Sequence, residues 1–233
     1  MRTGIEVDES RVTTNYSLVN TGRSCTIVSN FLSSPRMHFH KYAAEFLGTF
    51  ALAFAVWASI AFQMPFPVIP IAAGVTLGLF VYTVGGISGA HLNPAVTISV
   101  LSVGKIKTND AVMYVVCQLA GAAVAMTVGQ LLGSQASAAY ATTIQAGIAE
   151  AIGTFILAFG VLSALLQKVP PAASGLVVGG SLMVGAYIAS VFSNGILNPA
   201  VALSINAFGP MEILGPVVGA VAGAWARTAL DKS

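Results

Sequence analysis

The sequence predicts an all-α membrane protein, with six transmembrane helices and two re-entrant half-helices arranged as an inverted 3+3 repeat. Of its 233 residues, 56% are hydrophobic and 8% charged, and the mean hydropathy is +0.83. A soluble domain has about 25% charged residues. Apolar runs of about 20 residues, the length of a membrane-spanning helix, recur along the chain. Two motifs also occur twice, each at a spacing of 105 positions.

The first 40 residues differ from the rest. They are polar and mixed in charge, with little hydrophobic periodicity, and we expect a mostly disordered cytoplasmic tail. Residues 41–233 form the predicted membrane domain. Its first repeat covers about 42–132 and its second about 144–230.

Six apolar runs are predicted to span the membrane, at residues 42–62, 68–84, 111–132, 144–166, 174–192 and 213–230. Two shorter runs, 93–103 and 198–208, are too short to cross a bilayer. Each follows a loop rich in Gly and Ser, residues 85–89 and 193–195. These runs are the predicted half-helices.

Each half-helix opens with the same three residues. The motif reads Asn93-Pro94-Ala95 in the first repeat and Asn198-Pro199-Ala200 in the second. Asn caps a helix, and Pro at the first helical position gives up an N–H that would be unpaired anyway. One such turn is common, whereas two in a membrane-spanning chain are specific.

A second duplicated motif, Ala-Glu-x-x-Gly-Thr-Phe, carries Glu45 in the first repeat and Glu150 in the second. Each repeat has three spans, an odd number, so the second repeat must enter the membrane from the opposite side. Such inverted repeats place a site near the midplane, where the broken helices meet.

The positive charges support this topology. All ten Lys and Arg fall in the tail, after the first half-helix, between the fourth and fifth spans, or near the C-terminus. With six spans these segments lie on one side of the membrane. By the positive-inside rule both termini are cytoplasmic, and we expect a multi-pass protein of the plasma or inner membrane.

Half-helices that enter from opposite faces should bring Asn93 and Asn198 together at mid-membrane. Their amide N–H groups would donate hydrogen bonds to the oxygen of a water molecule, which the positive helix ends would also attract. A file of water polarised in this way passes water and opposes cations and protons. The alternative is that both Asn residues are only helix caps.

Three other polar residues lie in apolar surroundings. Glu45 and Glu150 could couple proton movement to transport, as in a proton-coupled secondary transporter. We favour structural acids that accept hydrogen bonds from loop N–H groups, because one stands in each repeat. His91 could line a pore or satisfy loop carbonyls, and both interpretations remain open.

The sequence points away from several other classes of protein. It has no zinc-type spacing and no Ser/His or Cys/His/Asp catalytic set, so we expect neither an enzyme nor a cofactor or metal. No basic patch interleaved with aromatic residues suggests nucleic acid. Cys25 and Cys117 should lie in different environments, which argues against a disulfide.

Over residues 42–230, both Asn-Pro-Ala boxes, the paired Ala-Glu-x-x-Gly-Thr-Phe motifs and the approach Ile87-Ser88-Gly89-Ala90-His91 resemble the aquaporin, or major intrinsic protein, family. The resemblance implies six tilted helices plus two half-helices around one pore per subunit, usually in a homotetramer within the lipid bilayer. It also implies passive passage of water and small neutral solutes.

The sequence departs from that family at the outer constriction. Most members have Arg directly after the second box, where this chain has Val201. The aligned constriction positions are Ala73, Ala186 and Gly195, although a one-residue slip would substitute Tyr187 for Ala186. The resemblance therefore implies a wide, apolar constriction that admits glycerol, urea or ammonia along with water. An apolar ring can instead resist wetting and slow water.

Overall fold

The computed structural model describes residues 16–20, 25–29, 35–139 and 142–231, and it describes side chains from Phe39 onward. Contacts divide the chain into two units, Met1–Phe39 and His40–Ser233. The division lies one residue from the predicted start of the membrane domain. Each unit is described by itself.

The N-terminal unit contains regular structure where we expected little. Strands β1 (Tyr16–Asn20) and β2 (Cys25–Ser29) pair antiparallel, with Tyr16 opposite Ser29 and Asn20 opposite Cys25. Both segments are rich in β-branched and aromatic residues, which favour strands. The expectation of disorder therefore does not apply to these two segments, and the other residues of the tail before Pro35 lie outside the described part.

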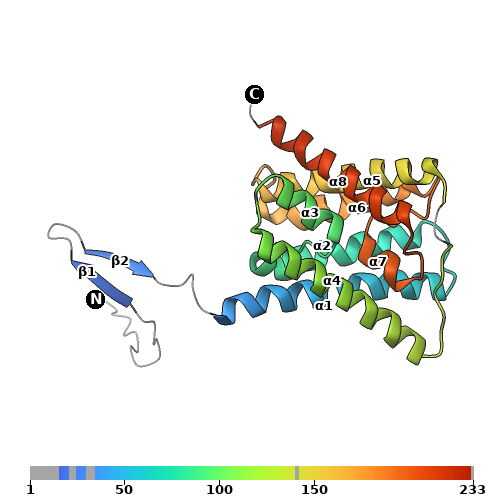
Figure 1. Ribbon diagram of the computed structural model, residues 1–233, viewed down its shortest axis with the longest axis horizontal. Helices are drawn as coiled ribbons and strands as arrows, with labels where there is room; N and C mark the ends of the chain where they lie inside the picture. Colours follow the sequence, from blue (N-terminus) through green and yellow to red (C-terminus); the bar gives the residue numbers. More distant parts are fainter. Residues whose placement is uncertain (1–15, 21–24, 30–34, 140–141, 232–233) are drawn as a thin grey trace, which may run out of the picture. The chain divides into compact units, whose positions relative to one another are not determined.

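The second unit is a helical bundle (Figure 1). Its six long helices are α1 (Pro35–Ala61), α2 (Val68–Ser88), α4 (Thr108–Leu131), α5 (Ile144–Leu165), α6 (Ser174–Ala189) and α8 (Pro210–Ala229). The two short helices are α3 (Pro94–Ser102) and α7 (Pro199–Ser204), and a 3-10 turn, η2 (Pro171–Ala173), precedes α6. The predicted spans and half-helices therefore all form helices.

Several predicted boundaries differ from the structure by a few residues; α7, for example, ends at Ser204 and not at residue 208. At the end of the second span the difference replaces a predicted loop. Residues 85–89 were expected to form a loop, but α2 continues to Ser88. Gly89 ends it in the left-handed conformation at φ 91°, and its N–H donates to the Gly85 carbonyl. Glycine disfavours a helix only by about 1 kcal/mol, so two glycines do not by themselves end it.

Five of the six long helices are apolar enough, as well as long enough, to cross a membrane, with α6 counted together with η2 as Pro171–Ala189. The sixth, α8, has 20 residues and is less apolar because it carries Glu212 and Arg227. Both of these side chains are buried within the bundle, at 1% and 8% exposure. Charged residues in membrane helices usually face the bundle interior in this way.

Glycines allow the helices to approach closely. On α2, a Cβ added to Gly78 would lie 2.7 Å from the Gly175 carbonyl oxygen of α6. On α8, a Cβ at Gly215 would lie 2.5 Å from the Gly147 oxygen of α5. Close backbone packing replaces the hydrophobic driving force that lipid does not supply between helices.

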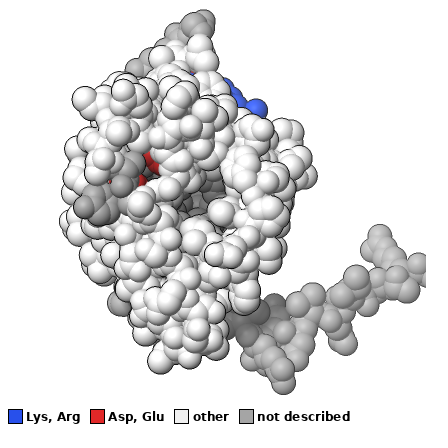
Figure 2. Space-filling view, turned by 90° about the vertical axis from the view of Figure 1, so that its right-hand side faces the viewer, with Lys and Arg blue, Asp and Glu red and all other residues white. Residues whose placement is uncertain are grey.

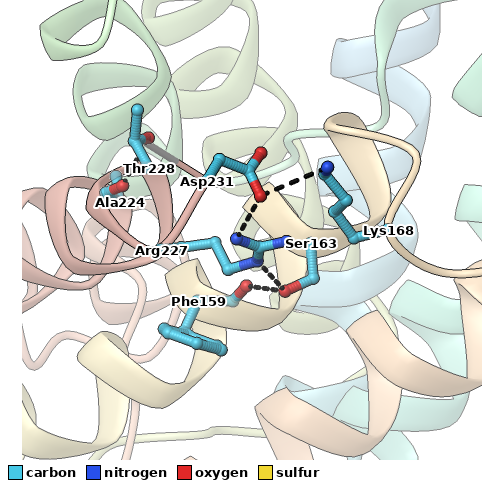
Figure 3. Close-up of polar contacts among 7 residues, drawn as sticks. All are labelled: Phe159, Ser163, Lys168, Ala224, Arg227, Thr228 and Asp231. Atoms are coloured by element: carbon cyan, nitrogen blue, oxygen red, sulfur yellow. Dashed lines mark hydrogen bonds and ion pairs between the residues drawn. The ribbon is translucent and has the colours of Figure 1, made fainter. Parts of the chain in front are cut away.

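Ion pairs lie at one end of the bundle, where α1 begins and α8 ends (Figure 1). Lys41 of α1 pairs with Asp110 of α4 at 2.8 Å. Figure 3 shows a second group, in which Asp231 pairs with both Lys168 and Arg227. The Arg227 Nε–H also donates to the Ser163 hydroxyl of α5 at 2.9 Å, so these contacts join the C-terminal ends of α5 and α8.

Candidate functional site

The two short helices meet at their N-terminal ends. Asn93 caps α3 by accepting from the Ala95 N–H at 2.8 Å, and Asn198 caps α7 by accepting from the Ala200 N–H at 3.0 Å. Pro94 and Pro199 occupy the first helical positions. The duplicated sequence therefore forms the same cap twice, as helix-capping preferences dictate.

The caps also cross-link the two loops. The Asn93 amide nitrogen donates to the Leu197 carbonyl at 2.8 Å, and the Asn198 nitrogen donates to the Leu92 carbonyl at 2.9 Å. Leu92 and Leu197 have positive φ angles of 48° and 58°, which turn their carbonyls toward the opposite Asn. The structure thus brings together two residues that lie 105 positions apart.

Glu45 holds the first loop. Its carboxylate is fully buried and accepts from four donors in the described residues: the Ser88 hydroxyl, the His91 and Leu92 N–H groups, and the Gln118 amide, at 2.7 to 2.9 Å. Backbone N–H groups in a buried loop need such partners. This acid therefore pairs loop donors that no regular secondary structure satisfies.

Glu150 has the same position in the second loop. It accepts from the Ser193 hydroxyl at 2.8 Å and from the Ile196 and Leu197 N–H groups at 3.1 and 2.7 Å. It is also fully buried. Its neighbour on α8 is a second buried acid, Glu212, which lies close enough to interact electrostatically.

His91 borders a cavity, and its described polar contacts are with the side chains of Glu45 and Thr97 and not with loop carbonyls. Its backbone N–H donates to Glu45, and its Nδ1 lies 3.2 Å from the Thr97 hydroxyl of α3. The ring also packs edge-on against Tyr114 at 5.3 Å between centroids. With 6% exposure, it lines an inner cavity of about 300 Å³.

That inner cavity lies at the end of the bundle that carries the ion pairs. Its lining includes Gly89 and Ala90 at the end of α2, Gln167 after α5 and Ser174 at the start of α6. Ala164 and Leu165 also line it, directly after Ser163, the residue that Arg227 contacts.

An outer cavity of about 190 Å³ opens at the opposite end of the bundle. Asn198, the second-repeat counterpart of Asn93, lines this cavity. So do all four predicted constriction residues, Ala73, Ala186, Gly195 and Val201. The remaining wall is mostly aliphatic and includes Leu52, Val56 and Ile69. Figure 2 views the bundle from this end and shows a hollow in a face with few charged side chains.

Tyr187, the alternative constriction residue, points elsewhere. Its side chain is 56% exposed and lines a separate surface pocket with Ser190 and Val191. Its ring packs against Phe66, which follows α1, at 5.3 Å between centroids. In the structure, therefore, Ala186 lines the outer cavity and Tyr187 does not.

Sequence reasoning missed three residues around the site. Gln118 of α4 donates to both Glu45 and Thr97, and Thr97 contacts His91. Phe66 lines the outer cavity. A Gln in an otherwise apolar span is a signal that could have revealed Gln118, whereas nothing local marks Phe66.

Comparisons with known proteins agree with this architecture. The family model for major intrinsic proteins matches residues 32–227. Aquaporin NIP1-3 of Oryza sativa subsp. japonica is 37% identical over 210 residues, which cover 80% of this chain and 72% of the relative. Nodulin-26 of Glycine max is 34% identical over 226 residues, covering 88% and 82%.

An archaeal relative and a solved structure complete the comparison. The probable aquaporin AqpM of Archaeoglobus fulgidus is 35% identical over 190 residues, covering 70% of this chain and 76% of the relative. The X-ray structure of the aquaglyceroporin from Plasmodium falciparum superposes with a TM-score of 0.64 at 22% identity, covering 84% and 96%, and so shares the fold. The chain therefore belongs to the major intrinsic protein, or aquaporin, family of multi-pass membrane proteins, which are passive channels for water and small solutes and not enzymes.

Proposed function

We propose that this channel passes water together with small uncharged solutes such as glycerol, urea and ammonia. The observation that carries the proposal is the outer cavity, whose constriction positions are Ala73, Ala186, Gly195 and Val201. Three of these side chains are methyl groups or hydrogens, so they leave room for a solute larger than water. Valine adds neither the donors nor the permanent charge that an arginine would bring.

Exclusion of ions and protons then rests on the Asn pair. Each amide group has two hydrogens, and each gives one to the carbonyl of the opposite loop. The second hydrogen on each side is available to a permeating oxygen. A water molecule that accepts from both amides turns its own hydrogens away from the pair, which interrupts proton transfer along the file.

The two buried acids serve this design as acceptors and not as proton carriers. Both oxygens of Glu45 and both of Glu150 accept hydrogen bonds from loop groups. An ionised carboxylate is the form that accepts such bonds, and protonation would remove part of its accepting capacity. This arrangement favours a passive channel over a proton-coupled transporter.

Both chain termini lie on the cytoplasmic side in this proposal. Four copies of the chain assemble in the plasma or inner membrane. The inner cavity lies at the end that carries Lys41, Lys168 and Arg227, which matches the positive-inside rule. Large apolar side chains exposed on α2 and α4, among them Val75, Leu79, Val112 and Val116, are suited to lipid or a neighbouring subunit.

Stopped-flow light scattering on proteoliposomes tests the function directly. Vesicles that contain the protein should shrink faster than protein-free vesicles in an impermeant osmolyte, and should then re-swell faster in glycerol and in urea. Fast water flow with rejection of both solutes would contradict the wide constriction. Concentrative uptake of a solute under an imposed proton gradient would instead support a proton-coupled transporter.

A further inference from the structure

We infer that Phe66 forms the outer rim of the pathway and sets the size of solute that enters it. The inference deepens the proposed function and rests on it. The four constriction side chains are all small, so bulk that limits the outer cavity must come from another residue. Among the described residues that line this cavity, Phe66 is the one aromatic.

The position of Phe66 suits a rim. Ile69, Pro70 and Ala73 line the cavity from one face of α2 at helical spacing, and Phe66 precedes them in the connection from α1. Phe66 therefore lies outside the level of Ala73. With 51% of its surface exposed, the side chain borders both the cavity and the solvent-facing side of the protein.

The ring is held from two directions. Pro65 and Pro67 flank it and restrict the backbone, and the Pro65 carbonyl accepts from the Val68 N–H at 2.9 Å at the start of α2. Tyr187 of α6 packs against the ring at 5.3 Å between centroids, with the two planes tilted by 32°. Together these contacts fix an aromatic ring at the entrance.

Tyr187 has a positioning role in this arrangement. It directly follows Ala186, a constriction residue, but its ring lies outside the outer cavity and packs against Phe66, which lines that cavity. Phe66 and Ser190 line both the outer cavity and the surface pocket of Tyr187, and so divide the two. A change at Tyr187 should therefore alter solute selection only while Phe66 is present.

The test is the ratio of glycerol to water permeability in proteoliposomes, measured for a graded series at position 66. Phe66→Ala should raise the ratio about fivefold, Phe66→Leu should raise it less, and Phe66→Trp should lower it. Phe62→Ala is the matched control, because Phe62 is also an exposed aromatic near the end of α1 but does not line the cavity. It should leave the ratio unchanged.

Tyr187→Ala alone should change the ratio of glycerol to water permeability. Added to a protein that already carries Phe66→Ala, it should change this ratio no further. A ratio that stays at the native value in Phe66→Ala, or a water and glycerol permeability that fall together, would overturn the inference. Equal shifts from Tyr187→Ala in both backgrounds would remove the positioning role. If native vesicles are no more permeable than protein-free ones, the proposed channel function fails instead, and the ratio has no meaning.

Discussion

The two halves of the inverted repeat share a plan but differ in the chemistry around it. In the first half, His91, Thr97 and Gln118 surround the loop with polar groups, and Glu45 accepts from four donors in the described residues. In the second half, Ile196 takes the place of His91 and Ala202 that of Thr97, and the described donors to Glu150 are three. The half-helices differ too, at nine residues for α3 and six for α7.

This difference shows which parts of the plan both halves need. The acid under each loop and the crossed Asn amides occur twice, so they belong to the architecture of the channel. Among the described residues, the cluster of His91, Thr97 and Gln118 lies in the first half, on the inner side, whereas the second half borders a largely apolar outer cavity. Val201 is the repeat counterpart of Val96, so the outer position simply carries the apolar residue of the first half.

The largest expected effect comes from removing the acids. Each buried donor left without a partner costs about 1–3 kcal/mol. Glu45→Ala should therefore lower the free energy of unfolding by roughly 4 kcal/mol or more, and Glu150→Ala by about 1 kcal/mol less, because it leaves fewer donors. Denaturant unfolding in detergent micelles measures both. Equal losses would mean that Gln118 adds nothing.

The Gln variants separate structure from proton chemistry at the same sites. Glu45→Gln and Glu150→Gln keep one acceptor oxygen each, so variants that fold should retain most of their water permeability. Water flow in proteoliposomes, normalised to inserted protein, checks this. Complete loss of flow in well-inserted Gln variants would point to proton transfer through the acids.

At the Asn pair, Asn198→Asp should admit more cation than Asn93→Asp. Each change replaces a donor with a possible negative charge, but Asn198 lines the outer cavity, where a cation arrives first. We expect a cation leak about tenfold above that of native vesicles for Asn198→Asp. Sodium flux into liposomes is the measurement, and two variants that both exclude sodium as the native protein does would contradict the role given to the pair.

Val201→Arg and Val96→Arg should have different effects on folding and on solute permeability, although the two residues are repeat counterparts. Val201 lines the outer cavity, and an arginine there should reduce glycerol and urea permeability about fivefold relative to water. Val96 is packed in the core at 1% exposure, so an arginine there buries an unpaired charge and should prevent folding. The yield of monodisperse protein and the solute flux distinguish the two. Unchanged solute flux in Val201→Arg would remove this residue from the constriction.

The smallest effect concerns the ion pairs at the inner end, where the second half has Asp231 between two cations. Burial raises the pKa of the Asp231 carboxyl, but the hydrogen bonds and charges of Arg227 and Lys168 outweigh it, so the pKa is lowered. The group therefore stabilises the fold above its ordinary pKa, and this contribution is lost as the pH falls through the lowered value. At pH 7 the Asp231→Asn variant should have a slightly lower melting temperature than the native protein. In strong acid the two melting temperatures should become equal. Thermal melts across this range measure it, and a gap that persists in acid would contradict the ion-pair origin.

Much of this arrangement could be predicted from the sequence because short local patterns of residues determine it. Helix-length apolar runs locate the long helices, and the repeated Asn-Pro turn locates the two half-helices and their crossing. Other features depend on contacts between distant segments. Gln118 is bound to Glu45 across 73 positions, and Phe66 meets Tyr187 only after the helices have packed. The extension of α2 to Ser88 likewise goes with contacts to distant residues, because the Ser88 hydroxyl donates to Glu45 and its carbonyl accepts from Tyr114.

The uncharged outer connections have a consequence for how molecules reach the pore. Residues 62–67, 132–143, 190–198 and 205–209 contain no Lys, Arg, Asp or Glu. Such a face should exert little long-range force on approaching ions, so dissolved salt has little field there to screen. Encounter with the entrance is then governed by concentration and diffusion alone. The rate at which even charged molecules encounter this entrance should thus depend little on the salt concentration.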